Sequence, residues 1–249
     1  PPMASLPRAG PFPSEEVAGL RTEVEIPFTQ TVRCGPESCV VPLDIVAPLE
    51  AEALPTIVLL QGGPRPFHER RNGPMIYALA HRGAVVFVSA YRSTETGNTP
   101  MHAYDDVRCA VRYAREHTAD YGGDPGRVVV VGLSFGSKVA LQMAVDPPVE
   151  PDICVAPGSG TPDAVVGLAG FGIQVREYSP EAPPMWLVAG SEDPRQTPDG
   201  RDDFADLEAA GFEVSFHELE GVTHDEMFDP AVTPEAVDLI FEAIDSLGG

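Results

Sequence analysis

The chain has 249 residues, and its 43% hydrophobic and 22% charged residues exclude a disordered chain, a coiled coil and a collagen-like fibre. Its apolar runs are far shorter than the ~20 residues of a membrane-spanning helix. Because 16 basic and 38 acidic residues give a net charge of -22, the surface should repel phosphate backbones and anionic lipids. We therefore expect no nucleic-acid or membrane partner.

The predicted elements begin with an irregular, proline-rich arm over residues 1–19. Alternating apolar and polar residues at 22–28 and 39–47 predict a half-buried antiparallel pair of strands. The pattern then changes to short, continuous apolar runs, typical of strands covered on both faces, separated by segments with helical spacing. Buried strands are expected at 56–60, 84–88, 128–131, 153–156, 186–189 and 214–217. Helices are expected at 75–81, 105–116, 134–144, 202–210 and 234–247. The second of these helices should carry its arginines, Arg108, Arg112 and Arg115, on the solvent side.

This alternation of buried strands and helices indicates an α/β protein with a mostly parallel central sheet and helices on both faces. The hairpin at the front adds an antiparallel edge. Residues 20–249 are therefore expected to form one domain. The long irregular stretch at 158–184 is too short for a large cap domain, although it could fold over a cleft.

The four cysteines have no zinc-ligand spacing, so we expect no metal site. Cys34 and Cys39 flank a turn that can bring their sulfurs within bonding range, and both a disulfide and two free thiols remain open. A disulfide would favour a secreted or periplasmic location, although no signal peptide is visible. Cys109 and Cys154 fall in an expected helix and an expected strand, where buried, unpaired thiols are common.

The most informative motif lies at 128–137, where a buried strand is followed by Gly-x-Ser-x-Gly and then by a helix. A serine at such a strand-to-helix turn projects from the carboxyl edge of the sheet. The helix N-terminus offers free N–H groups and the positive end of its dipole, which favour an anionic intermediate. Ser134 is therefore the candidate nucleophile, and the alternative is a packing turn rich in glycine and serine.

A serine hydroxyl needs a general base, and six histidines are available. Four of them precede Ser134 and break the chain order Ser, acid, His that is expected here: His68, His81, His102 and His117. His217 falls inside an expected strand. His224 follows the last strand at the carboxyl edge of the sheet, so it is the candidate base.

The acid should follow an earlier strand at the same edge. Asp193 lies in the turn that Gly190 opens after the strand at 186–189, and its carboxylate can accept the imidazole Nδ1–H. Glu192 is its main rival.

An oxyanion hole needs two backbone donors at this edge. The N–H of Phe135, directly after the nucleophile, supplies one of them. The glycine pair after the strand at 56–60 supplies the other, and Gly63 is preferred to Gly62 because the following Pro64 has no N–H.

Together these motifs resemble the α/β-hydrolase superfamily, and in particular compact carboxylesterases and the catalytic domains of prolyl oligopeptidase and acylaminoacyl peptidase-type enzymes. The segments that carry the resemblance are 60–64, 90–93, 121–127, 189–193 and 221–224. The resemblance implies the α/β-hydrolase fold and a serine hydrolase that needs no metal or cofactor. Gln61 stands where those peptidases have histidine. The chain is too short for their propeller domain, and this favours an esterase.

We therefore expect a serine hydrolase that cleaves small-molecule esters of short acyl chains through an acyl-enzyme. A small peptidase or amidase, an acyltransferase and a non-catalytic binding module on the same fold are the alternatives. The acyl pocket should be shallow, with walls from residues 158–184 and 64–72. The sequence does not indicate the oligomeric state.

Overall fold

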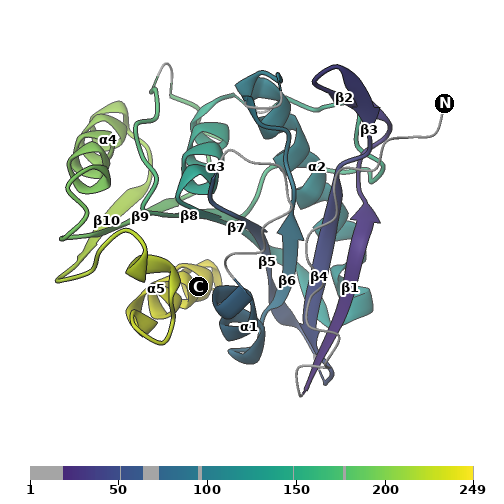
Figure 1. The fold of residues 1–249 in the computed structure, drawn as a ribbon, viewed down its shortest axis with the longest axis horizontal. Helices are drawn as coiled ribbons and strands as arrows, with labels where there is room; N and C mark the ends of the chain where they lie inside the picture. The colour runs from purple at the N-terminus through teal and green to yellow at the C-terminus, as the bar shows by residue number, and fades with distance from the viewer. Residues whose placement is uncertain are drawn as a thin grey trace.

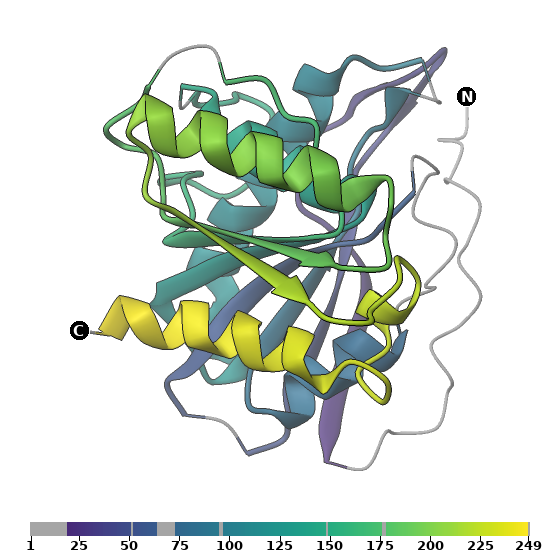
Figure 2. The same ribbon diagram turned by 90° about the vertical axis from the view of Figure 1, so that its left-hand side faces the viewer.

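The computed structural model describes residues 19–50, 52–63, 73–94, 97–147, 149–175 and 178–248. The irregular arm expected over residues 1–19 lies outside these ranges, apart from Gly19. In the described residues a twisted sheet forms the middle layer, with helices on either side of it (Figures 1 and 2).

Eight strands make up the central sheet, and most of them run parallel. Across the sheet they are β1 (Leu20–Pro27), β4 (Pro42–Pro48), β6 (Val85–Ser89), β5 (Leu54–Leu60), β7 (Gly123–Leu133), β8 (Ala164–Leu168), β9 (Met185–Gly190) and β10 (Val214–Leu219). β4 pairs antiparallel with β1 and with β6, whereas the pairs from β6 to β10 are all parallel. β2 (Val32–Cys34) and β3 (Glu37–Cys39) form a separate antiparallel hairpin.

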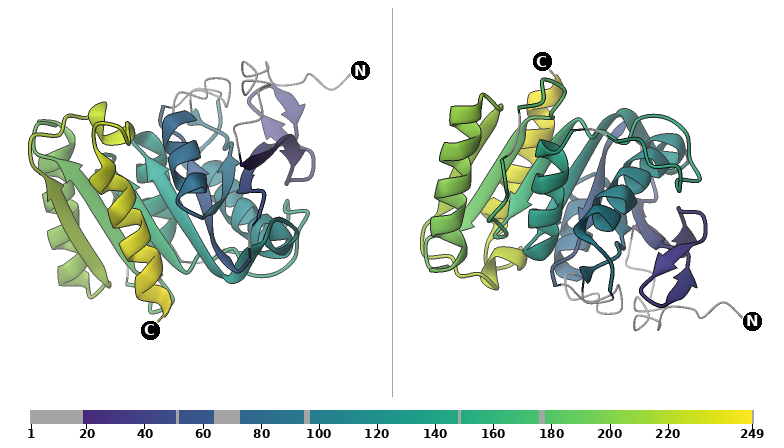
Figure 3. Two further views of the ribbon diagram at one scale, coloured as in Figure 1. Left: turned by 90° about the horizontal axis from the view of Figure 1, so that it is seen from below. Right: turned by 90° about the horizontal axis from the view of Figure 1, so that it is seen from above.

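Helices cover both faces of the sheet, as Figure 3 shows from below and from above. On one face lie α1 (Gly73–His81) and α5 (Pro234–Asp245), and on the other α2 (Pro100–His117), α3 (Phe135–Val145) and α4 (Gln196–Ala210). Short 3-10 helices are η2 (Thr118–Tyr121), η3 (Glu226–Phe228) and η4 (Ser246–Gly248). Successive residues of β5 alternate between the two cores: Val58 packs with α2 and α3, and Ile57 and Leu59 pack with α1 and α5. The predicted fold class, a mostly parallel sheet with helices on both faces and an antiparallel N-terminal pair, is confirmed.

The sheet contains one strand that the sequence does not predict. β8 lies inside the stretch 158–184, where irregular structure is expected, and all of its residues are buried. Residues 153–156, where a strand is expected, contribute only an isolated bridge between Thr29 and Cys154. A Cβ at Gly167 would lie 2.5 Å from Ser137 Oγ, so glycine is what lets α3 pack onto β8. The same glycine weakens the strand pattern in the sequence.

Three helices begin earlier than predicted: α1 at Gly73, and by a larger margin α2 at Pro100 and α4 at Gln196. In α2 the first turn is closed by the Thr99 backbone N–H, which donates to His102 Nδ1 at 3.2 Å. Burial lowers the pKa of His102, which favours the neutral ring that accepts this bond. In the described part of the chain, no helix is both long and apolar enough to cross a membrane.

The arginines of α2 hold loops rather than face solvent. Arg108 is only 4% exposed, and its Nη2 donates to the carbonyl oxygens of Met143 and Pro147 at 3.3 Å each. Arg112 and Arg115 are half-buried. The expectation of a solvent-facing Arg108 is therefore wrong, because the backbone carbonyls at the end of α3 need a donor.

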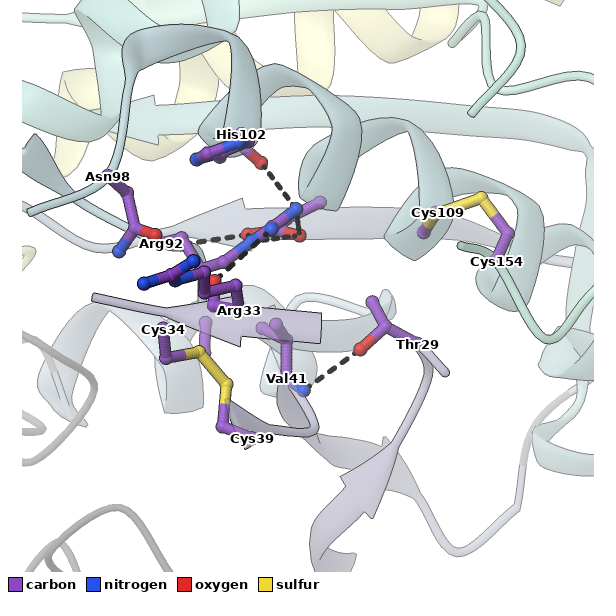
Figure 4. A network of polar contacts seen from close by, with 12 residues as sticks. Thr29, Arg33, Cys34, Cys39, Val41, Arg92, Asn98, His102, Cys109 and Cys154 are labelled. Atoms are coloured by element: carbon purple, nitrogen blue, oxygen red, sulfur yellow. Dashed lines mark hydrogen bonds and ion pairs between the residues drawn. A yellow bond between two sulfur atoms is a disulfide. The ribbon is translucent and has the colours of Figure 1, made fainter. Parts of the chain in front are cut away.

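The structure contains two disulfides, and Figure 4 shows both of them. One joins Cys34 to Cys39 and closes the hairpin of β2 and β3. The other joins Cys109 of α2 to Cys154, so the expectation of two unpaired thiols there is wrong. The bridge between Thr29 and Cys154 runs this segment past α2, which brings together cysteines that are 45 residues apart in sequence.

Candidate active site

Ser134 stands between the last residue of β7 and the first residue of α3, with φ 52° and ψ -118°. A sparsely populated conformation of this kind costs a residue other than glycine about 1–3 kcal/mol, so its neighbours must hold it. The Ser134 N–H donates to the carbonyl of Leu168 in β8 at 2.8 Å, and the Ser134 carbonyl accepts from the N–H of Ser137 at 2.9 Å. The turn thus presents the serine at the carboxyl edge of the sheet.

Two glycines flank this turn because helix and strands approach closely there. A Cβ at Gly132 would lie 2.4 Å from the Cα of Ser137, and a Cβ at Gly136 would lie 2.5 Å from the carbonyl oxygen of Leu60. Real Cβ atoms essentially never come so close to backbone atoms. Only glycine at both positions therefore lets α3 begin directly against β5 and β7.

The structure brings Ser134, His224 and Asp193 into one chain of hydrogen bonds. His224 Nε2 lies 3.0 Å from Ser134 Oγ, and His224 Nδ1 lies 2.6 Å from Asp193 Oδ2. His224 follows β10, Asp193 follows β9, and both loops lie at the edge of the sheet that carries Ser134. The three side chains that the sequence predicts, from three separate loops, therefore lie within hydrogen-bonding distance in the order Ser134, His224, Asp193.

Asp193 is held on both of its oxygens. While Oδ2 faces His224, Oδ1 accepts the backbone N–H groups of Arg195 at 3.2 Å and Gln196 at 3.0 Å, at the start of α4. Asp193 is 4% exposed, whereas its sequence rival Glu192 is exposed. The carboxylate of Asp193 is thus fixed in the position that orients the imidazole.

The glycine loop after β5 lies against Ser134, the candidate nucleophile. A Cβ at Gly62 would come within 2.9 Å of the Ser134 Cβ, and Gly63 has a φ of 86°, which glycine adopts without strain. The N–H of Phe135 belongs to the first turn of α3, where helix N–H groups have no partner within the helix. Residues 64–72, expected to form one wall of the pocket, lie outside the described residues.

The other described histidines make different contacts. His102 accepts the bond from Thr99 in α2, and His217 on β10 bonds to Ser215. His81 and His117 stand at the ends of α1 and α2. His68 lies outside the described residues. Of the described histidines, His224 is the one that bonds to Ser134.

The structure adds one residue to which no motif assigns a role. The Tyr91 hydroxyl donates to the carbonyl of Gln61 at 2.8 Å, and its ring stacks on Phe135 with centroids 6.4 Å apart. Burial raises the pKa of Tyr91 well above its usual range, so the hydroxyl remains protonated. In the sequence, Tyr91 lies just after a buried strand, at the edge that carries Ser134, and within the segment 90–93 that carries part of the resemblance, but neither signal gives it a role.

When a serine hydroxyl, an imidazole and a carboxylate are hydrogen-bonded in this order, the imidazole can take the serine proton as the serine oxygen attacks a carbonyl. Within the described ranges, no group of three or more His, Cys, Asp or Glu side chains could hold a metal ion. The hydrogen bonds among Ser134, His224 and Asp193 support the chemistry of an activated serine beside backbone N–H donors.

Comparison with known sequences finds a family model, BD-FAE, that matches residues 43–151. Esterase LipQ of Mycobacterium tuberculosis is 31% identical over 104 residues, which are 39% of this chain and 24% of LipQ. The match therefore spans about a quarter of that relative's length.

Solved structures match over nearly the whole chain. The esterase Est2 of Thermogutta terrifontis with bound propionate aligns with a TM-score of 0.67 and 20% identity, over 90% of this chain and 95% of that one. The same esterase phosphoramylated by tabun aligns with a TM-score of 0.69 and 20% identity, over 94% and 96%. MGS-M1, an α/β-hydrolase enzyme from a Medee basin deep-sea metagenome library, aligns with a TM-score of 0.69 and 18% identity, over 92% and 98%. The predicted resemblance is confirmed: this chain has the α/β-hydrolase fold and is similar to esterases that share it.

Proposed function

We propose that this chain is a serine hydrolase that cleaves carboxylic esters of short acyl chains through an acyl-enzyme. The observation that carries the proposal is the pair of hydrogen bonds from Ser134 Oγ to His224 Nε2, 3.0 Å, and from His224 Nδ1 to Asp193 Oδ2, 2.6 Å. Both distances suit proton transfer from the serine and a fixed imidazole tautomer.

In the first half-reaction, Ser134 Oγ attacks the ester carbonyl while its proton moves to His224 Nε2. Asp193 stabilises the imidazolium that forms. The N–H groups of Phe135 and Gly63, with Gly62 as the second choice, stabilise the oxyanion of the tetrahedral intermediate. His224 then gives its proton to the leaving alkoxide, and the ester oxygen departs as an alcohol.

In the second half-reaction, a water molecule loses a proton to His224 and attacks the acyl-enzyme. The carboxylic acid leaves, and Ser134 recovers its proton from the imidazole. No step uses a metal or a cofactor. We infer that residues 20–249 carry this chemistry as a single domain without a large cap.

Esters are favoured over amides by the names of the relatives. LipQ is named an esterase, and the Thermogutta esterase is described with propionate, a short carboxylate, in its structure. The same esterase is described as phosphoramylated by tabun, an electrophile of the kind that labels activated serines. These are properties of those proteins, and they support a short-chain esterase as the proposal for this one.

A labelling experiment tests the proposal directly. A fluorophosphonate probe should modify the wild-type protein at one peptide, which contains Ser134, and the Ser134→Ala variant should take no label. The wild-type protein should hydrolyse p-nitrophenyl acetate faster than the matched p-nitroanilide. When an alcohol is added as a competing acceptor, most of the acyl group should still be transferred to water. A label at another residue contradicts the nucleophile, and a preference for the anilide favours the peptidase alternative.

A further inference from the structure

Tyr91 contacts both halves of the proposed oxyanion hole. Its hydroxyl donates to the carbonyl of Gln61 at 2.8 Å and approaches that of Gly63 at 3.4 Å. Its ring stacks on Phe135, whose N–H is the other proposed donor, with an interplanar angle of 23°. One side chain thus touches the glycine loop and the residue after the nucleophile.

The backbone around Tyr91 is fixed on both sides. The N–H of Ala90 donates to the carbonyl of Pro42 at 3.1 Å, and the N–H of Arg92 donates to Asp106 Oδ2 at 2.7 Å. The Arg92 guanidinium pairs with the Asp106 carboxylate at 2.8 Å, and both side chains are buried. Tyr91 is therefore held between two anchors.

The Arg92 anchor extends into the N-terminal hairpin. Figure 4 shows the guanidinium between the carbonyl groups of Arg33 and His102, to which it donates at 3.5 and 3.4 Å. Arg33 is the neighbour of Cys34 in the disulfide-closed hairpin. Because the guanidinium bonds to the hairpin and to α2 at once, it leaves the segment from 90 to 92 little freedom to move.

The contacts of Tyr91 set the direction in which the loop's N–H groups point. In a trans peptide the C=O and the following N–H point in opposite directions. The hydrogen bond from Tyr91 to the Gln61 carbonyl therefore also fixes the direction of the Gly62 N–H. The contact of Tyr91 with the Gly63 carbonyl restrains the peptide group of Gly63 in the same way. The Gly63 N–H lies between these two restrained carbonyls. Glycines restrict their own backbone least, so this loop depends on such external bonds.

We propose that Tyr91 is a positioning residue: its buried hydroxyl holds the backbone of residues 61–63 so that the N–H groups of this loop face the oxyanion of the transition state. This inference rests on the proposed serine hydrolase function. Tyr91 acts through the loop and does not touch the substrate. Its effect belongs to the transition state and not to the bound ester, because negative charge develops on the carbonyl oxygen only as the serine attacks.

The test is Tyr91→Phe, which removes one oxygen and keeps the ring on Phe135. We expect kcat for p-nitrophenyl acetate to fall about tenfold to a hundredfold, less than the loss of a direct oxyanion donor, while KM changes little. The affinity for a trifluoromethyl ketone, whose adduct carries the oxyanion, should fall by the same factor as kcat/KM. The shape of the pH profile should not change, because the base is untouched.

The matched control is Tyr121→Phe, since the Tyr121 hydroxyl donates to Glu23 at 2.9 Å, away from the loop. This variant should keep the wild-type kcat and the wild-type ketone affinity. Circular dichroism and thermal melting of both variants show whether the fold is retained. A Tyr91→Phe enzyme with wild-type kcat, or one whose KM rises and melting temperature falls while kcat holds, overturns the inference and leaves the proposed function standing. A wild-type protein that neither hydrolyses the ester nor takes the phosphonate label at Ser134 overturns both.

Discussion

At the scale of single residues, the candidate site depends on a serine that is held in an unfavourable backbone conformation. The φ of 52° at Ser134 is maintained by hydrogen bonds to β8 and α3, and the glycine at 170 leaves room for it. A Cβ at Gly170 would lie 1.7 Å from the Ser134 carbonyl oxygen. The position of this candidate nucleophile is therefore set by its backbone surroundings and not by its own side chain.

Replacement of Ser134 separates activity from stability. Ser134→Ala should lower ester hydrolysis at least about a thousandfold, because the attacking oxygen is gone while binding and the oxyanion donors remain. Its stability should stay within about 1 kcal/mol of wild type. Ser134→Gly should be equally inactive but more stable than Ser134→Ala, since glycine adopts the positive φ without strain. Rates with p-nitrophenyl acetate and urea unfolding curves check both points; near-native activity in either variant would rule out Ser134 as the nucleophile.

Replacement of the acid distinguishes Asp193 from its neighbour. Asp193→Asn should lower kcat about a thousandfold to ten-thousandfold, because an amide at this position favours the wrong imidazole tautomer. Glu192→Gln is the matched control and should change kcat little, because the Glu192 side chain is exposed and the imidazole Nδ1 already pairs with Asp193. Steady-state kinetics of the two variants decide the assignment, and the reverse order of effects would make Glu192 the acid.

The residues of the candidate site differ in how far the sequence reveals them. Ser134, Asp193 and His224 could be selected because each follows a strand whose apolar pattern is clear, and parallel strands end at one edge of the sheet. Tyr91 could not be assigned a role. Its hydroxyl bonds to a backbone carbonyl, and that partner leaves no pattern of side chains in the sequence.

At the scale of elements, strands were predictable where the apolar run was uninterrupted, as in β5, β6 and β7. β8 was missed because Gly167 interrupts its pattern, although that glycine is required by the contact with α3. The starts of α2 and α4 lie earlier than the sequence predicts, and in α4 the reason is that its first turn, Gln-Thr-Pro-Asp, is polar and lacks the apolar spacing of a helix. The Cys109–Cys154 disulfide could not be foreseen, since the pairing depends on how residues 152–155 pass α2.

The two disulfides should contribute unequally to stability. A cross-link that closes a longer loop removes more conformational entropy from the unfolded chain. The sequence separation is 45 residues for Cys109–Cys154 and 5 for Cys34–Cys39. Their removal should therefore lower the free energy of unfolding by about 4 and about 2 kcal/mol respectively.

Urea unfolding of Cys109→Ala/Cys154→Ala and of Cys34→Ala/Cys39→Ala, compared with wild type, measures this difference. Mass spectrometry of a non-reduced digest provides the control, since each linked peptide should be present in the wild type and absent from its variant. Equal losses of stability, or a larger loss for the hairpin pair, would contradict the entropic account.

At the scale of the whole molecule, the eight-stranded sheet collects the loops after β5, β6, β7, β9 and β10 at one edge, and the candidate site is built from these loops. The segment after β8 also lies at that edge, and its backbone is hydrogen-bonded to side chains of α4. The N–H of Phe171 donates to Gln196, and the N–H groups of Gly172 and Ile173 donate to Asp203 at 2.7 and 3.2 Å. Residues 171–173 are thus tied to α4 and are not free to open as a lid.

The hydrogen bonds between residues 171–173 and α4 bear on which substrates we expect the proposed esterase to prefer. A shallow acyl pocket buries few methylene groups, and each buried methylene contributes about 0.8 kcal/mol. The gain from a longer chain should therefore stop early, so acetyl to butyryl esters should have higher kcat/KM than long-chain esters. Rates should not jump when the substrate exceeds its solubility, because interfacial activation needs a lid that opens over an apolar surface.

A series of p-nitrophenyl esters of increasing acyl length, compared by kcat/KM, measures this preference. Long-chain esters assayed on both sides of their solubility limit test for interfacial activation, with the Ser134→Ala variant as the blank for spontaneous hydrolysis.

The hydrogen bonds that Asp203 accepts from the N–H groups of Gly172 and Ile173 allow one further comparison. Asp203→Asn weakens this acceptor and should broaden the range of acyl lengths if residues 171–173 set its limit. A wild-type maximum at about ten carbons or more, each methylene still adding its ~0.8 kcal/mol, would mean that the pocket is deep and that the segment from 169 to 184 opens as a lid.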